Sequence, residues 1–160
     1  MLQGKKIAVI GVGMVGKAII SGLLRSHAVS PGEIAGSTAH EETAWKAAEE
    51  LGVEVITDNR KLIRGRDVVI VAVKPKSVLK VLSEIKELIE PEQLLISVAA
   101  AVRTRTIEEE LGKPVPVVRA MPNMPCLVRQ GMTVLCAGRF ADRGHLELSR
   151  EVFSAVGRVA

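Results

Sequence analysis

Residues 6–16 read KIAVIGVGMVG, an apolar run that leads directly into three glycines spaced G-x-G-x-x-G. The run before Gly11 is typical of a buried strand, and the residues from Met14 onward predict a helix. Between them Gly11 permits a tight turn, Gly13 lets backbone approach a pyrophosphate, and Gly16 lets helix pack on strand. The N-terminus of the helix adds free N–H groups and the positive end of its dipole. This stretch predicts a dinucleotide-binding unit, with a purely structural turn as the alternative.

From one end to the other the chain alternates short β-branched runs with helical patterns. Such alternation implies βαβ units, and right-handed crossovers then give helices on both faces of the sheet. We expect one α/β domain over residues 1–160, with a doubly wound, mostly parallel sheet of Rossmann type. The expected strands cover residues 6–10, 33–37, 53–56, 67–73, 93–98, 115–120 and 132–137, and residues 157–160 resemble the start of another. The expected helices cover residues 14–25, 41–51, 59–64, 76–89, 104–111 and 141–156.

The composition is that of a globular protein with an aliphatic core. Hydrophobic residues make up 48% of the 160 positions, charged residues 25%, and aromatic residues only 2%. The net charge of +4 is scattered along the chain. Nucleic-acid binding requires clustered Lys and Arg with aromatic stacking platforms, and neither is present. A mildly basic domain suits a small anionic ligand instead.

The cysteine, histidine and hydropathy patterns argue against a disulfide-rich, metal-binding, secreted or membrane-spanning protein. Cys126 and Cys136 lie outside any CxxC motif and the three histidines are far apart, so we expect no disulfide framework and no metal site. The residues before the first strand are too few for a signal peptide. No apolar run reaches the roughly 20 residues that span a bilayer. We expect a reduced, cytoplasmic protein with no membrane or nucleic-acid partner.

The end of the second expected strand bears on the choice of cofactor. Folds that prefer NAD carry Asp or Glu there, to bind the ribose 2′-hydroxyl. Here Ser37 and Thr38 occupy the position, and Glu33 lies at the wrong end of the strand. Hydroxyls without a carboxylate accommodate a 2′-phosphate, over which Asn59 and Arg60 would close. The alternative is that the two hydroxyls cap the following helix. NADP(H) is therefore favoured, and NAD(H) remains possible.

Ligands of doubly wound sheets bind beyond the carboxyl ends of the strands. Lys74 follows the fourth expected strand, where a buried charge would need a partner such as a cofactor phosphate or ribose; the alternative is an exposed lysine. The small residues Ala99 to Ala101 follow the fifth strand and either admit a nicotinamide or form a tight packed loop. Asn123 follows the sixth, in a loop stiffened by two prolines. Arg119 in the same segment pairs with a carboxylate or is structural.

No Ser/His/Asp arrangement, paired carboxylates or metal-ligand spacing occurs in the sequence. We therefore assign no catalytic residue and no metal ligand to this chain. What it offers is a cradle for a cofactor, and the chemistry would be that of the cofactor.

Four blocks of sequence identify a family resemblance. Residues 7–24 read IAVIGVGMVGKAIISGLL, 67–78 read DVVIVAVKPKSV, 94–102 read LLISVAAAV, and 117–138 read VVRAMPNMPCLVRQGMTVLCAG. In order and spacing they resemble the pyrroline-5-carboxylate reductases, over essentially the whole chain. The resemblance implies hydride transfer from NAD(P)H to the C=N carbon of 1-pyrroline-5-carboxylate, which gives L-proline.

The resemblance also implies which residues hold the cofactor. The glycine loop would bind the pyrophosphate, the second-strand hydroxyls the adenosine ribose or its phosphate, and the loops after the fourth, fifth and sixth strands the rest of the molecule. The expected cofactor-binding residues are Gly11, Val12, Gly13, Met14, Val15, Gly16, Ser37, Thr38, Asn59, Ala72, Val73, Lys74, Val98, Ala99, Ala100, Ala101 and Asn123.

Three departures from the family pattern carry expectations of their own. Ala101 stands where the family usually has glycine, and Met14 stands where a polar residue is frequent. Family members also continue into a helical domain that dimerises and holds the substrate, and this sequence contains no such domain. We expect the chain alone to bind cofactor, to turn over poorly, and to self-associate. The alternatives are a related imine reductase with another substrate, or a non-catalytic NADP(H)-binding module.

Overall fold

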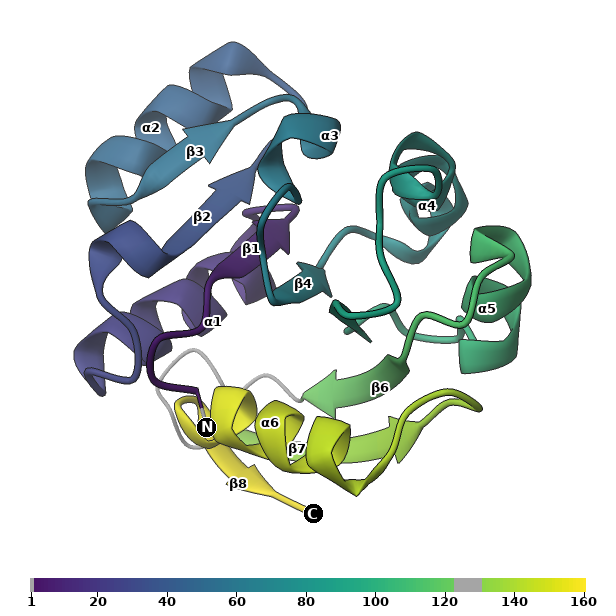
Figure 1. Ribbon diagram of the computed structural model, residues 1–160. Helices are drawn as coiled ribbons and strands as arrows, with labels where there is room; N and C mark the ends of the chain where they lie inside the picture. Colours follow the sequence, from purple (N-terminus) through teal and green to yellow (C-terminus); the bar gives the residue numbers. More distant parts are fainter. Residues whose placement is uncertain (1, 123–130) are drawn as a thin grey trace.

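The computed structural model describes residues 2–122 and 131–160. These residues form one eight-stranded sheet with helices on both faces (Figure 1). In chain order the elements are β1 (Ile7–Ile10), α1 (Met14–Arg25), β2 (Ile34–Ser37), α2 (Glu41–Leu51), β3 (Glu54–Ile56), α3 (Asn59–Leu62), β4 (Val68–Val71), α4 (Val78–Ile85), β5 (Leu94–Ser97), α5 (Thr104–Leu111), β6 (Val117–Pro122), β7 (Gly131–Ala137), α6 (Arg143–Ser154) and β8 (Gly157–Val159).

The strand order is β3-β2-β1-β4-β5-β6-β7-β8, with β1 to β6 all parallel. The expected doubly wound, mostly parallel sheet is confirmed. β7 runs antiparallel to β6, and β8 runs parallel to β7. Because the order of the strands reverses at β1, the loops after β1 and β4 diverge to opposite faces there, which is where such sheets bind ligands.

Two apolar layers hold the helices to the sheet. On one face α1 and α6 pack through residues such as Ile20 and Phe153, both fully buried. On the other face α3, α4 and α5 pack through residues such as Leu82 and Ile107. Figure 1 shows α4 and α5 standing together beside the sheet and α6 lying against the last strands. The strands between these layers are buried on both faces, which explains their near-continuous Val, Ile and Leu.

Several expected element boundaries differ from the structure, and three of these differences bear on the site or the sheet. The helix expected over 76–89 begins as a 3-10 turn, Pro75–Ser77, and its regular part is the shorter α4. β4 ends at Val71, so Lys74 lies beyond the strand and is exposed. β6 continues into what we expected to be a Pro-rich turn, because antiparallel β7 pairs Val134 with Met121 and Thr133 with Pro122. A proline is tolerated there because it lies at the strand end.

Within the described residues no helix is long and apolar enough to cross a membrane.

Two hydrogen bonds between Ser30 and Glu33 stabilise the turn before β2. The Ser30 N–H and hydroxyl both donate to Glu33, and these two bonds lower the pKa of that exposed carboxyl. Their contribution to stability is therefore present above the ordinary carboxyl pKa and is lost as the pH falls through the lowered value.

Candidate functional site

The glycine turn between β1 and α1 is anchored to the neighbouring strands. Gly11 has φ +95°, a conformation that disfavours other residues, and its missing side chain leaves room for backbone of the β4 loop. A Cβ there would lie 2.8 Å from Val73 Cγ1 and 3.0 Å from the Ala72 carbonyl. The N–H groups of Gly11 and Val12 both donate to the Ser37 carbonyl, at 3.0 and 2.9 Å. The turn is thus fixed against the ends of β2 and β4.

Gly13 and Gly16 have different surroundings. A Cβ on Gly16 would lie 2.4 Å from the Gly11 carbonyl oxygen, so the close packing of α1 on the turn requires glycine. A Cβ on Gly13 would meet no protein atom within 4 Å. Packing within the described part of the chain therefore does not account for a glycine at 13. The open space beside it fits a ligand group that approaches the backbone.

The start of α1 is suited to an anion. Gly13 is the N-cap and offers no side-chain cap, and the first turn carries no acidic residue. The N–H groups of that turn therefore point outward with no carboxylate competing for them. Met14, in the first turn, is 60% exposed, while Val12 is buried and packs against Gly36. Val12 thus contributes its backbone rather than its side chain to the loop.

A pocket of about 230 Å³ opens beside this turn. It brings together Gly11, Ser37, Thr38, Asn59 and Val73, five residues that the sequence singled out from four separate segments. The remaining lining residues are Ile10, Ala39, Thr57, Ser77, Lys80, Val81 and Glu84.

A chain of hydrogen bonds crosses this pocket. The Ser37 hydroxyl donates to Asn59 Oδ1 at 2.5 Å, and Asn59 Nδ2 donates to Glu84 Oε1 at 2.8 Å. Neither hydroxyl of the Ser37-Thr38 pair caps α2, which begins after His40 without a side-chain cap. The capping interpretation is therefore wrong.

Two charged side chains named in the sequence analysis do not line this pocket, and their contact with a bound cofactor stays a prediction. Arg60 is exposed and does not line the pocket, because α3 turns its side chain away while its N–H bonds to Asp58. Lys74 is exposed after the end of β4 and does not line the pocket either, so the argument from a buried charge does not apply.

Sequence reasoning missed Lys80 and Glu84. Both lie on α4, four residues apart, so they share a face of the helix. The amphipathic pattern of residues 76–89 places charges on the solvent side of a helix, but it does not say that this side borders a pocket. No local signal in the sequence distinguishes these two charged residues from the others on α4.

The loop after β5 is close to the turn through its neighbour β4. Val98 N–H donates to the Val71 carbonyl at 3.1 Å, and the N–H of buried Ala99 donates to the Ser97 hydroxyl at 3.3 Å. Ala100 and Ala101 are exposed. Asn123, the last of the expected cofactor contacts, lies outside the described residues.

Ala101 occupies the left-handed region, with φ +62°, while its neighbour Ala100 does not. For a residue with a Cβ this conformation costs about 1 kcal/mol or more. We expect Ala101→Gly to raise the free energy of unfolding by about 1 kcal/mol, measured by urea denaturation. Ala100→Gly is the matched control and should lower it slightly, because it only adds freedom to the unfolded chain. Equal losses in both variants would contradict the assignment of strain to Ala101.

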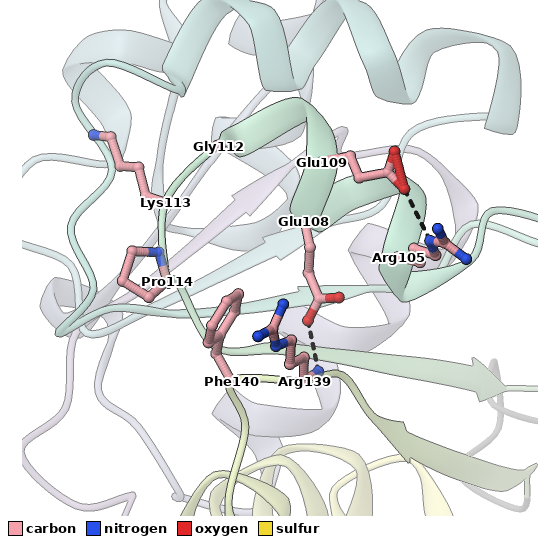
Figure 2. Close-up of a pocket in the computed structure, with 8 residues that line it drawn as sticks. All are labelled: Arg105, Glu108, Glu109, Gly112, Lys113, Pro114, Arg139 and Phe140. Carbon is pink, nitrogen blue, oxygen red and sulfur yellow. Dashed lines mark hydrogen bonds and ion pairs between the residues drawn. The ribbon is translucent and has the colours of Figure 1, made fainter.

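A larger hollow, about 740 Å³, lies elsewhere, between the end of α5 and the end of β7 (Figure 2). Its charged side chains already have partners within the described chain, including Lys113, which donates to the Ile89 carbonyl. Glu108 accepts the Arg139 N–H at 2.6 Å, Glu109 pairs with Arg105 at 3.0 Å, and the Arg139 guanidinium lies 5.4 Å from the centre of the Phe140 ring. It opens at the amino ends of the parallel strands, opposite the glycine turn. Size alone therefore does not identify the ligand site.

A doubly wound, mostly parallel sheet with an uncapped glycine turn after its central strand defines the class of dinucleotide-binding domains. The chain belongs to the family described as NADP oxidoreductase coenzyme F420-dependent, whose model matches residues 6–101.

Individual relatives agree with the resemblance found in the sequence. A pyrroline-5-carboxylate reductase from Methanosarcina acetivorans is 36% identical over 98% of this chain and 58% of its own length. Another from Pseudomonas aeruginosa is 36% identical over 95% of this chain and 55% of its own. The solved structure of a pyrroline-5-carboxylate reductase from Coxiella burnetii matches with a TM-score of 0.90 and 35% identity, over 97% of this chain and 57% of that one. The chain thus spans a little more than half the length of these relatives.

Proposed function

We propose that this chain is the cofactor-binding part of a pyrroline-5-carboxylate reductase and that it binds NADP(H) in preference to NAD(H). The observation that carries the proposal is the open space at Gly13, at the uncapped start of α1. A diphosphate there would receive backbone N–H groups and the positive end of the helix dipole. The identity shared with named reductases supports the particular reaction.

Residues of this chain would bind and orient the cofactor. The turn from Gly11 to Gly16 would hold the diphosphate, and the pocket containing Ser37, Thr38 and Asn59 would hold the adenosine end. Ala72 and Val73 would lie along the middle, and the loop from Val98 to Ala101 would border the nicotinamide, together with Asn123. When bound, the cofactor supplies the hydride.

In the proposed reaction a hydride reaches the imine carbon of 1-pyrroline-5-carboxylate and a proton reaches the nitrogen, giving proline. Hydride transfer needs the imine carbon held about 3–3.5 Å from the nicotinamide. The described residues provide no paired acid and base at the cradle, so we propose that the groups that hold the imine belong to the part of the relatives that this chain does not span. The 160 residues would therefore constitute one cofactor-binding domain.

Fluorescence titration of the 160-residue chain with NADPH and with NADH tests this proposal. We expect saturable binding of both, tighter for NADPH. In a parallel assay, absorbance at the NADPH band should fall very slowly when 1-pyrroline-5-carboxylate is added, because the imine is not positioned. A folded chain that binds neither nucleotide would overturn the proposal. Rapid proline formation would instead contradict the proposal that the groups holding the imine belong to the part of the relatives that this chain does not span.

Self-association is a separate part of the proposal. On β7 the side chains of Met132 and Val134 are 40% and 43% exposed, while the alternate residue Thr133 is fully buried under α6. One face of this strand is therefore apolar and uncovered in the described structure, which favours association. Light scattering at increasing concentration tests it, and a strictly monomeric chain at high concentration would contradict it. A cytoplasmic location is proposed on the cysteine pattern, to be checked by cell fractionation.

A further inference from the structure

The helix α4 presents two opposite charges to the pocket beside the glycine turn. Lys80 and Glu84 are the charged members of the pocket lining, and the rest of the lining is apolar, small or neutral polar. Their spacing of four residues places both side chains on the same side of α4. Across the pocket lie Ser37 and Thr38, at the end of β2.

Four of the five neutral side-chain donors of this pocket are already directed to other groups of the chain, and Ser77 is the fifth. The Ser37 hydroxyl donates to Asn59, and the Asn59 amide donates to Glu84. The Thr38 hydroxyl donates to the His40 carbonyl at 3.0 Å, and the Thr57 hydroxyl bonds with Glu41 at 3.3 Å. A ligand in this pocket would therefore find few uncommitted neutral donors.

Lys80 is different. Among residues 2–122 and 131–160 it makes no hydrogen bond and no ion pair, although it lines the pocket. Other lysines do have partners: Lys17 pairs with Glu50 at 3.0 Å, Lys86 with Glu110 at 3.7 Å, and Lys113 donates to the Ile89 carbonyl at 2.8 Å. The ammonium group of Lys80 is thus available to a ligand.

We propose that Lys80 and Glu84 together set the choice between NADPH and NADH. Lys80 receives the phosphate on the adenosine ribose, because that dianion needs a cation and most of the neutral donors are committed. Glu84 acts in the opposite sense: a carboxylate repels a phosphate and accepts a hydrogen bond from a ribose hydroxyl. The inference rests on the proposed function, in which this pocket holds the adenosine end of the cofactor.

The carboxylate of this pocket has a different origin from the one in folds that prefer NAD. In folds that prefer NAD the carboxylate stands at the end of β2, where this chain has Ser37 and Thr38. Here a carboxylate of the pocket comes from α4 and accepts a hydrogen bond from Asn59, whose Oδ1 accepts from Ser37. The hydroxyls of Ser37 and Thr38 alone therefore do not decide the preference between NADPH and NADH. The negative charge of Glu84 lies in the same pocket, and the positive charge of Lys80, one helical turn away, offsets it.

Titration of four proteins with NADPH and NADH tests the inference. The variants are Lys80→Ala, Glu84→Gln and, as a control, Lys76→Ala, which removes the same charge from an exposed residue that does not line the pocket. We expect Lys80→Ala to weaken NADPH binding by about tenfold or more and NADH binding by less than about twofold. Glu84→Gln keeps an acceptor for Asn59 and should tighten NADPH binding several-fold while weakening NADH binding. Lys76→Ala should change the ratio of the two affinities by less than about twofold.

Ionic strength gives a second readout, which a merely structural role of Lys80 would not move. Raising the salt concentration should reduce the NADPH preference of the unmodified chain, because exposed charges are screened. It should have little effect on the ratio in Lys80→Ala. An unchanged ratio in Lys80→Ala, or an equal change in Lys76→Ala, would overturn the inference and leave the proposed function standing. A folded chain without affinity for either nucleotide would overturn both.

Discussion

Replacing Gly13 by valine is expected to abolish binding of both nicotinamide dinucleotides, with the dissociation constants rising by more than about 100-fold. The space next to Gly13 contains no protein atom within 4 Å of a Cβ, so a branched side chain there would occupy the place proposed for the diphosphate. Loss of several backbone N–H contacts to a charged group accounts for an effect of this size.

The fold should survive this substitution. Gly13 has φ −100°, outside the left-handed region that favours glycine, and a Cβ there would meet no described atom within 4 Å. Thermal unfolding followed by circular dichroism should show a midpoint close to that of the unmodified chain. Gly32→Val is the matched control, because a Cβ there also meets nothing within 4 Å but lies far from the turn. Binding retained within about threefold in Gly13→Val would remove the main support for the proposed function.

Replacing Gly16 by alanine is expected to have its largest effect on stability. A Cβ at this position would lie 2.4 Å from the carbonyl oxygen of Gly11 and 3.3 Å from its carbon. Both are backbone atoms of a turn that is tied to Ser37, so they cannot move aside as a flexible side chain would. α1 would have to shift away from β1, and we expect the free energy of unfolding to fall by about 2–3 kcal/mol.

Urea denaturation measures this loss, and Gly144→Ala provides the control. Gly144 lies in α6, where a Cβ would approach only the Asp142 side chain, at 3.3 Å. There the better helix propensity of alanine should leave stability unchanged or slightly raised. If Gly16→Ala were as stable as the unmodified chain, the close contact of α1 with the turn would not be a constraint on this fold.

The two glycine substitutions thus separate roles that the motif combines. Gly13→Val should remove binding while the protein stays folded, and Gly16→Ala should weaken the fold. Gly11 combines both constraints, since its positive φ and its contact with the β4 loop each require glycine. The motif alone identifies the turn, but only the surroundings of each glycine show which task it performs.

Much of the fold followed from local patterns in the sequence. The run from Lys6 to Ile10, the three glycines and the helix after them lie within a few residues of one another, so backbone sterics and apolar periodicity decide their structure locally. The same holds for the end of α2, where Gly52 has φ +72°, the left-handed conformation that glycine adopts readily. Resemblance to a known family then implied which residues would bind the cofactor.

What the sequence determined by itself was the identity of each element and the glycine turn that defines the cradle. The tertiary structure decided which distant residues meet. It placed Glu84 of α4 against Asn59, brought unpaired Lys80 to the same pocket, and left Lys74 in solvent. The physical reason is that periodicity tells which face of a helix points away from the core, whereas the neighbours of that face depend on crossovers and packing between segments far apart in the chain.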